Sequence, residues 1–345
     1  MPLTDGNAPA GRLVPGIVGA VSPRARVVAL TVAAALVAAA LAVGAAMLPD
    51  SPRGTAPVSP AAKPRAGAPP LALDLGLRDD AEARELRRAA VLFDRGRNAQ
   101  AAAAFERLDS LEAQVGDAFA RWPDGSVDRL GQLAGLYPRS AFVQVNLGIA
   151  LFWANERGAA DAWRAAEDAE PDTPYAVMAG DFLHQETARG LPVFTPSFDT
   201  PQRIARLEGQ AQLDALRAAA QSGGARDKLL YGVALQRLGR PVSAERAYAA
   251  AAWVAPDDPE AQVAAAVGRF DKANPSLAFS RLGPLTRRFP QAATVRFHLG
   301  VLLLWTGRVK EARRQLRLAE SEQPGSVAAR EARRYLDSLA TIGTG

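Results

Sequence analysis

The stretch Arg226–Asp258 decides the fold: RDKLLYGVALQRLGRPVSAERAYAAAAWVAPDD. Apolar residues recur at helical spacing over Leu229–Leu235, and Leu238–Arg240 interrupts them. A second helical run covers Ser243–Val254, and Pro256 ends it because proline cannot continue a helix. The stretch therefore predicts two helices joined by a tight turn.

The same pattern returns along the chain at a fixed period. Pro256, Pro290 and Pro324 follow one another at intervals of 34 residues. Six positions also recur 68 residues later in one register: Gly232, Gly239, Ala244, Tyr248, Ala251 and Pro256 return as Gly300, Gly307, Ala312, Leu316, Ala319 and Pro324. A repeat of this length predicts helix pairs that stack and share a continuous core.

This order of Gly, Leu, Gly, Ala, Tyr, Ala and Pro resembles the tetratricopeptide repeat (TPR), a helix–turn–helix unit of 34 residues. The resemblance is sharp over residues 140–171, 226–258 and 293–326 and covers most of residues 81–326. We therefore expect an all-α protein, a TPR-like α-solenoid of antiparallel helix pairs over residues 81–342. Val327–Ala340 resembles a terminal capping helix.

The N-terminal part of the chain differs in composition. Residues 1–26 are rich in Gly and Pro and are expected to form a flexible tail. Val27–Leu48 has 22 residues without a charge, about 33 Å as a helix, which matches a bilayer core. A transmembrane anchor, a cleaved signal peptide and a buried helix are the three interpretations, and the anchor is preferred. Residues 49–80 are predicted to be a Pro/Ala-rich linker, whose proline-rich part, Pro49–Pro70, is expected to have no binding role.

Charge predicts both the orientation and the class of partner. Arg24 and Arg26 abut the apolar run, which favours a single-pass membrane protein whose repeat domain is extracytoplasmic. Residues 73–345 carry 35 basic and 34 acidic side chains, so a nucleic-acid partner is not expected. The chain has no cysteine and only two histidines, which excludes thiolate chemistry and leaves little material for imidazole chemistry.

The resemblance also implies where partners bind. In the TPR family the first helices of successive units line a concave groove that holds an extended peptide or a partner helix. Facing positions in this sequence would be Phe93, Phe152, Trp153, Gln236, Arg237, Phe297 and Trp305. Aromatic rings would supply apolar contact, while Arg and Gln would bond the bound backbone. For any one ring, packing against the next repeat is the competing interpretation.

An insertion interrupts the repeats between Pro171 and Ser222, where the excess length falls in residues 187–199. Phe194 and Phe198 flank Pro196 there, so the loop could lie over the groove as a lid or plug, or could be a tolerated insertion. Nearby acidic and imidazole groups, Asp181, His184 and Glu186, are the nearest approach to a metal or acid–base cluster. Glu186 lies off the helical face of the other two, so no metal site is predicted.

The function predicted from these features is a membrane-anchored TPR scaffold that binds other proteins or peptides in its groove. The layout of one N-terminal span and extracytoplasmic repeats suggests a role in assembling the bacterial cell envelope. We expect no enzymatic activity, no cofactor and no metal. The alternative is an enzyme or small-ligand binder that uses the 187–199 insertion with Asp181 and His184.

Overall fold

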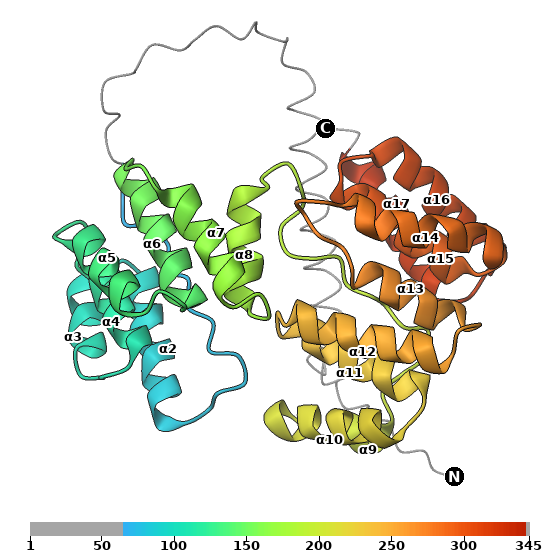
Figure 1. Ribbon diagram of the computed structural model, residues 1–345, viewed down its shortest axis with the longest axis horizontal. Helices are drawn as coiled ribbons and strands as arrows, with labels where there is room; N and C mark the ends of the chain where they lie inside the picture. The colour runs from blue at the N-terminus through green and yellow to red at the C-terminus, as the bar shows by residue number, and fades with distance from the viewer. Residues whose placement is uncertain (1–64, 343–345) are drawn as a thin grey trace, which may run out of the picture.

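The computed structural model describes residues 65–342 (Figure 1), and the all-α prediction is confirmed for them: they form sixteen helices and no strand. The first half contains α2 (Ala81–Asp94), α3 (Asn98–Phe105), α4 (Leu111–Ala120), α5 (Ser126–Leu136), α6 (Ala141–Ala154), α7 (Ala159–Ala169) and α8 (Pro174–Leu183). The second half contains α9 (Gln202–Ala205), α10 (Gly209–Ser222), α11 (Ala225–Arg237), α12 (Pro241–Val254), α13 (Pro259–Val267), α14 (Ser276–Arg288), α15 (Ala293–Trp305), α16 (Val309–Glu322) and α17 (Val327–Ile342).

Side-chain caps begin several of these helices. The Ala176 N–H donates to Thr173 Oγ1 at the start of α8, and the Glu260 N–H donates to Asp258 Oδ1 at the start of α13. Each cap is followed by a proline in the first helical turn, where no N–H is needed. The sequence between the insertion and Ser222 is predicted as one helix, Pro201–Gln221, because Thr200 and Pro201 provide a cap; in the structure it is two, α9 ending at Ala205 and α10 beginning at Gly209.

Glycine in the first helix of a pair makes room for a large side chain of the second helix. A Cβ placed on Gly232 would stand 2.4 Å from the ring of Tyr248, and one on Gly300 would stand 2.9 Å from Leu316. Such approaches are too close for any residue with a side chain. The recurrent glycines of the sequence therefore mark the contact between the two helices of α11–α12 and α15–α16.

The pair α6–α7 uses the same contact with a different turn. Gly148 lies under Trp163, whose Nε1 would be 2.3 Å from a Cβ there. The separation is fifteen residues rather than sixteen, because the turn is built differently. Asn155 and Gly158 both adopt left-handed backbone (φ 60° and 102°), whereas Gly239 alone does so between α11 and α12.

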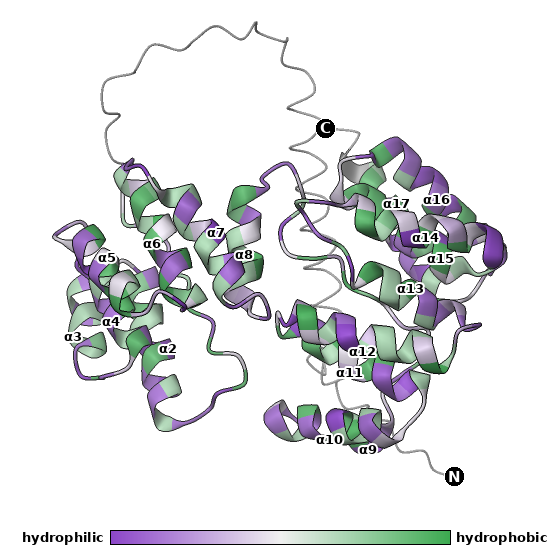
Figure 2. Ribbon diagram, in the orientation of Figure 1, coloured by the Kyte–Doolittle hydropathy of each residue, from purple (hydrophilic) through white to green (hydrophobic). Residues whose placement is uncertain are grey.

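The connecting segment, which we define as Ala188–Phe198, separates the two halves. Buried side chains before it form one large core, and those from Ala188 onward form another, with a small cluster around Ile204. α8 packs on α6 and α7, whereas α10 packs on α11 (Figure 1). Hydrophilic residues predominate on α16 at the far end of the second half (Figure 2), with Ala312, Leu316 and Ala319 buried beneath.

The predicted single-pass membrane location is corrected by the structure. None of the helices within residues 65–342 is long and apolar enough to cross a bilayer. The longest of them, α17, has 16 residues, about 24 Å, and carries several charges. Val27–Leu48, from which the prediction came, lies outside the described residues, as do the predicted tail and the linker up to residue 64.

Candidate functional site

The first helices of the pairs in each half hold an extended piece of the chain itself. In the first half this piece is Leu71–Leu75, which we call the N-terminal segment. Asn146 on α6 binds it with both ends of its amide: Oδ1 accepts from the Ala72 N–H (3.0 Å), and Nδ2 donates to Ala72 O (2.9 Å). Asn146 has no exposed surface. Residues 71–75, which were predicted to belong to the linker, are therefore packed into the fold.

Tyr175 on α8 repeats this arrangement two residues further along the segment. Its hydroxyl accepts from the Asp74 N–H (3.0 Å) and donates to Asp74 O (2.7 Å). Burial raises the pKa of this phenol above its ordinary value, so the hydroxyl stays protonated. Alternate residues of an extended chain face the same side, so Ala72 and Asp74 can both be bound by the neighbouring helices α6 and α8.

In the second half the connecting segment crosses the first helices α11, α13 and α15 (Figure 1). Gln236 on α11 binds it with both ends of its amide: Nε2 donates to Pro192 O (2.7 Å), and Oε1 accepts from the Phe194 N–H (3.1 Å). His298 Nε2 on α15 accepts from the Thr195 N–H (3.0 Å). Glu260 Oε1 on α13 accepts from the Ser197 N–H (3.0 Å).

An ion pair anchors the start of the connecting segment. The ammonium of Lys272, whose side chain is 5% exposed, pairs with Asp181 on α8 and donates to Ala188 O (2.8 Å). Asp181 Oδ1 also accepts from the Gly190 N–H (2.8 Å). Asp181 is thus occupied in fixing the segment between the halves.

Burial shifts the pKa values of two acceptors under the connecting segment, His298 and Glu260. His298 Nδ1 lies 2.7 Å from Thr294 O and donates to it, which leaves Nε2 free of a proton to accept from Thr195. Burial lowers the pKa of His298 to about 4. Burial also raises the pKa of Glu260, although the Ser197 N–H opposes that shift.

The predicted groove residues lie in three kinds of position. Phe93, Phe297 and Trp305 are 6%, 2% and 2% exposed and pack in the cores. Half-buried Gln236 binds the connecting segment, and Arg237 is exposed at the end of α11. The remaining two, Phe152 and Trp153, are half-buried next to Arg65. The binding role of all seven residues stays a prediction.

Arg65 brings the N-terminal stretch against the end of α6. Its guanidinium carbon lies 3.7 Å from the centroid of the Phe152 ring and 5.8 Å from that of Trp153. The backbone N–H of Arg65 donates to Trp153 O (2.9 Å). A cation over an aromatic face is a stabilising contact, so these two predicted residues contact the chain itself.

Sequence reasoning missed Asn146, Tyr175, Glu260 and His298. A signal for two of them exists: Asn146 and His298 each stand two residues before the packing glycine of their own repeat, Gly148 and Gly300. Both are polar residues within largely apolar helices, and both are buried. A buried polar side chain needs a partner, and here the partner is the backbone of an extended segment.

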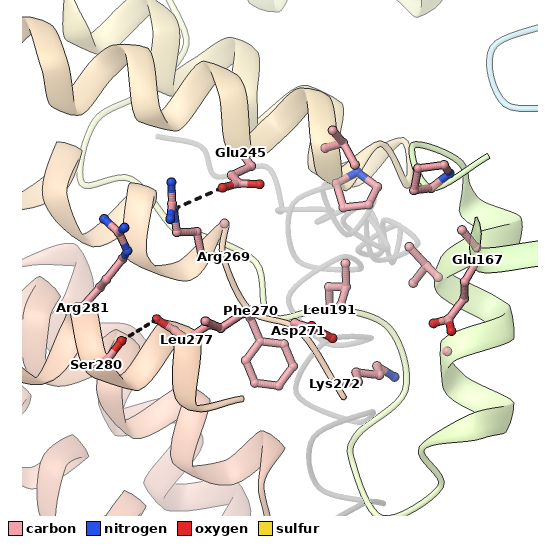
Figure 3. A pocket seen from close by; sticks show the side chains of 17 residues that line it. Glu167, Leu191, Glu245, Arg269, Phe270, Asp271, Lys272, Leu277, Ser280 and Arg281 are labelled. Carbon is pink, nitrogen blue, oxygen red and sulfur yellow. Dashed lines mark hydrogen bonds and ion pairs between the residues drawn. The ribbon is translucent and has the colours of Figure 1, made fainter. Parts of the chain in front are cut away.

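A cavity of about 570 Å³ lies between the halves, where α7 and α8 face α12 and the loop after α13 (Figure 3). Glu167 stands on one wall, and burial raises the pKa of its carboxyl. The Glu245–Arg269 ion pair (3.1 Å) stands on the opposite wall. Asp172 closes the junction nearby by accepting from the Ser243 N–H (2.9 Å) and from Arg240 (3.2 Å).

Asp181 and His184, the two residues of the alternative enzyme interpretation, have different partners in the structure. Asp181 is bonded to Lys272 and Gly190, whereas His184 Nδ1 lies 3.5 Å from the exposed carboxylate of Glu186. Within residues 65–342 no group of three or more acidic, imidazole or thiol side chains is arranged to hold a metal ion.

No family model matches the chain, and no curated protein matches it. Among solved structures it is similar to YrrB, described as a TPR protein with an unusual peptide-binding site, at 17% identity over 60% of this chain and 99% of that chain, with a TM-score of 0.29. It is also similar to the APC/C hetero-tetramer Cut9–Hcn1, at 14% identity over 76% of this chain and 56% of that one, with a TM-score of 0.26.

Proposed function

We propose that this chain is a scaffold that binds extended segments of other proteins along the first helices of its TPR-like pairs. One observation carries the proposal: in each half, an amide side chain on a first helix binds both a carbonyl and an N–H of an extended backbone. Asn146 does so with Ala72, and Gln236 does so with Pro192 and Phe194.

Contacts of this kind suit a binding surface for peptides. Backbone N–H and C=O groups are common to all sequences, so bonds to them give affinity for extended chains in general. Specificity then comes from the side-chain pockets between the bonds, where aromatic rings contribute large contact areas. The two segments of the chain itself display this mode of binding.

The test is capture of extended peptides by the full chain. An array of 12-residue peptides from the host proteome would be probed with wild type, Asn146→Ala and Gln236→Ala, and hits would be confirmed by calorimetry. Trp253→Ala is the matched control, because Trp253 lies on the second helix α12 and is 87% exposed. All four proteins would first be checked for equal helicity.

We expect each amide variant to lose a distinct set of peptides and the Trp253 variant to lose none. Loss of two bonds to a ligand backbone weakens binding about tenfold or more. If all four proteins bind the same peptides with equal affinity, or none binds a peptide, the first helices are not the binding surface.

A further inference from the structure

The connecting segment leaves none of its central backbone donors unused. Over residues 194–197, the N–H groups of Phe194, Thr195 and Ser197 each meet a side-chain acceptor of a first helix. The fourth residue is Pro196, which has no N–H. Proline thus stands at the one position among residues 194–197 that needs no acceptor.

The side chain of Phe194 fills a specific pocket. It is 1% exposed, stacks on the His298 ring with centroids 5.0 Å apart, and meets the Tyr248 ring edge-on at 5.7 Å. Pro192 is buried as well, and its carbonyl binds Gln236. A large aromatic ring with proline two residues before and two residues after it therefore occupies this surface in the folded chain.

The surface extends beyond the segment that occupies it. A second cavity of about 570 Å³ opens past Ser197 and Phe198, where the helices α11, α13, α15 and α17 begin. Its lining includes Arg226, whose guanidinium carbon lies 5.2 Å from the centroid of the Phe198 ring, and Thr294. A partner segment longer than the chain's own would therefore find further contacts at this end.

Building on the proposed function, we propose that the first helices α11, α13 and α15 bind a partner segment with the pattern Pro-x-Phe-x-Pro, and that the connecting segment is its tethered competitor. The segment occupies the backbone acceptors and the ring pocket that such a partner needs. Because it is tethered at both ends, its effective concentration is high, and a free peptide must displace it. The apparent affinity of the partner is then its intrinsic affinity multiplied by the fraction of chains whose surface is free.

The test uses the full chain and a synthetic peptide of its own residues 189–200, RGLPVFTPSFDT. Phe194→Ala in the chain empties the ring pocket while the peptide keeps its phenylalanine. We expect this variant to bind the peptide at least tenfold more tightly than wild type does, measured by fluorescence anisotropy. A peptide with alanine in place of its phenylalanine should lose at least tenfold in affinity, and Trp253→Ala should behave as wild type.

A second variant guards against failure of Phe194→Ala to fold. Ser197→Pro changes an exposed position, removes the N–H donated to Glu260 and restricts the backbone there, so it weakens the segment without emptying the core. We expect it to bind the peptide several-fold more tightly than wild type. If the folded variants bind the phenylalanine peptide no better than the alanine peptide, the proposal is overturned.

A second probe separates this proposal from the proposed function. The peptide PPLALDLGLR, residues 69–78, is extended in the fold but has no aromatic residue. We expect the Phe194→Ala chain to prefer the first peptide at least tenfold. Equal affinity for both would overturn the Pro-x-Phe-x-Pro pattern while leaving a scaffold for extended peptides. Binding of neither, by any variant, would overturn both proposals.

Discussion

Gly232 and Tyr248 are in direct contact across the pair α11–α12: the ring lies where a Cβ of residue 232 would be. Tyr248 has no exposed surface, so its ring cannot move into solvent. The contact explains why a glycine and a large residue recur in these helix pairs fifteen or sixteen residues apart. It also makes the glycine irreplaceable although its backbone is ordinary helix.

We therefore expect Gly232→Ala to destabilise the protein. Overpacking a filled core costs about 1–3 kcal/mol, whereas replacing glycine by alanine in a helix gains about 1 kcal/mol. The cost is the larger of the two here because the buried Tyr248 ring cannot move away. Gly131→Ala in α5 is the control, because nothing lies within 4 Å of a Cβ there. In urea unfolding, the free energy of unfolding should fall for Gly232→Ala and rise by about 0.5–1 kcal/mol for Gly131→Ala. A gain for both would contradict the packing argument.

The helix pairs could be predicted from the sequence because their contacts are local. Glycine, alanine and proline at fixed offsets encode how two consecutive helices touch, and Pro256 or Gly239 act within their own turn. Such signals involve residues separated by at most one repeat. They survive in α6–α7 even though its turn is one residue shorter.

The extended segments could not be predicted in the same way. Their bonds join residues far apart in sequence: Ala72 meets Asn146 at a separation of 74 residues, and Thr195 meets His298 at 103. Extended backbone carries no periodic signal, and the proline-rich stretch before residue 71 suggested a linker. Gln236 was predicted as a groove residue from its place in the repeat, and a loop lying over the groove was one of two interpretations of residues 187–199, but the sequence could not decide between them.

We expect Asp181→Asn to destabilise the junction of the two halves. The variant keeps a side-chain oxygen at position 181 but removes the negative charge that compensates the buried Lys272 ammonium, and breaking a buried charge pair costs up to about 3–5 kcal/mol. Asp161→Asn is the matched control, since the Arg164–Asp161 pair is largely exposed and worth less than about 1 kcal/mol. Thermal unfolding measures both. If Asp181→Asn and Asp161→Asn lower Tm equally, the buried Lys272–Asp181 pair stabilises the fold no more than an exposed pair does.

We expect Asn146→Ala to release the N-terminal segment while the rest of the fold remains. The variant leaves the Ala72 N–H and C=O buried without partners, which costs about 1–3 kcal/mol for each group. Hydrogen exchange of amides 71–75 should quicken at least tenfold, while the amides of Phe194, Thr195 and Ser197 in the other half keep their rates. Unchanged exchange at Ala72 would mean that Leu71–Leu75 is held by its apolar contacts alone.

The last prediction concerns acid. His298 has a pKa of about 4 in the folded chain against an ordinary value of 6.5, so the unfolded chain binds more protons between these limits. Stability is therefore full above pH 6.5, falls as the pH drops, and has lost about 3 kcal/mol from this residue below pH 4. His298→Gln keeps an acceptor for the Thr195 N–H but cannot titrate. Urea unfolding between pH 7 and pH 4 should therefore show a flatter profile for this variant, and equal slopes would mean that His298 is not the group responsible.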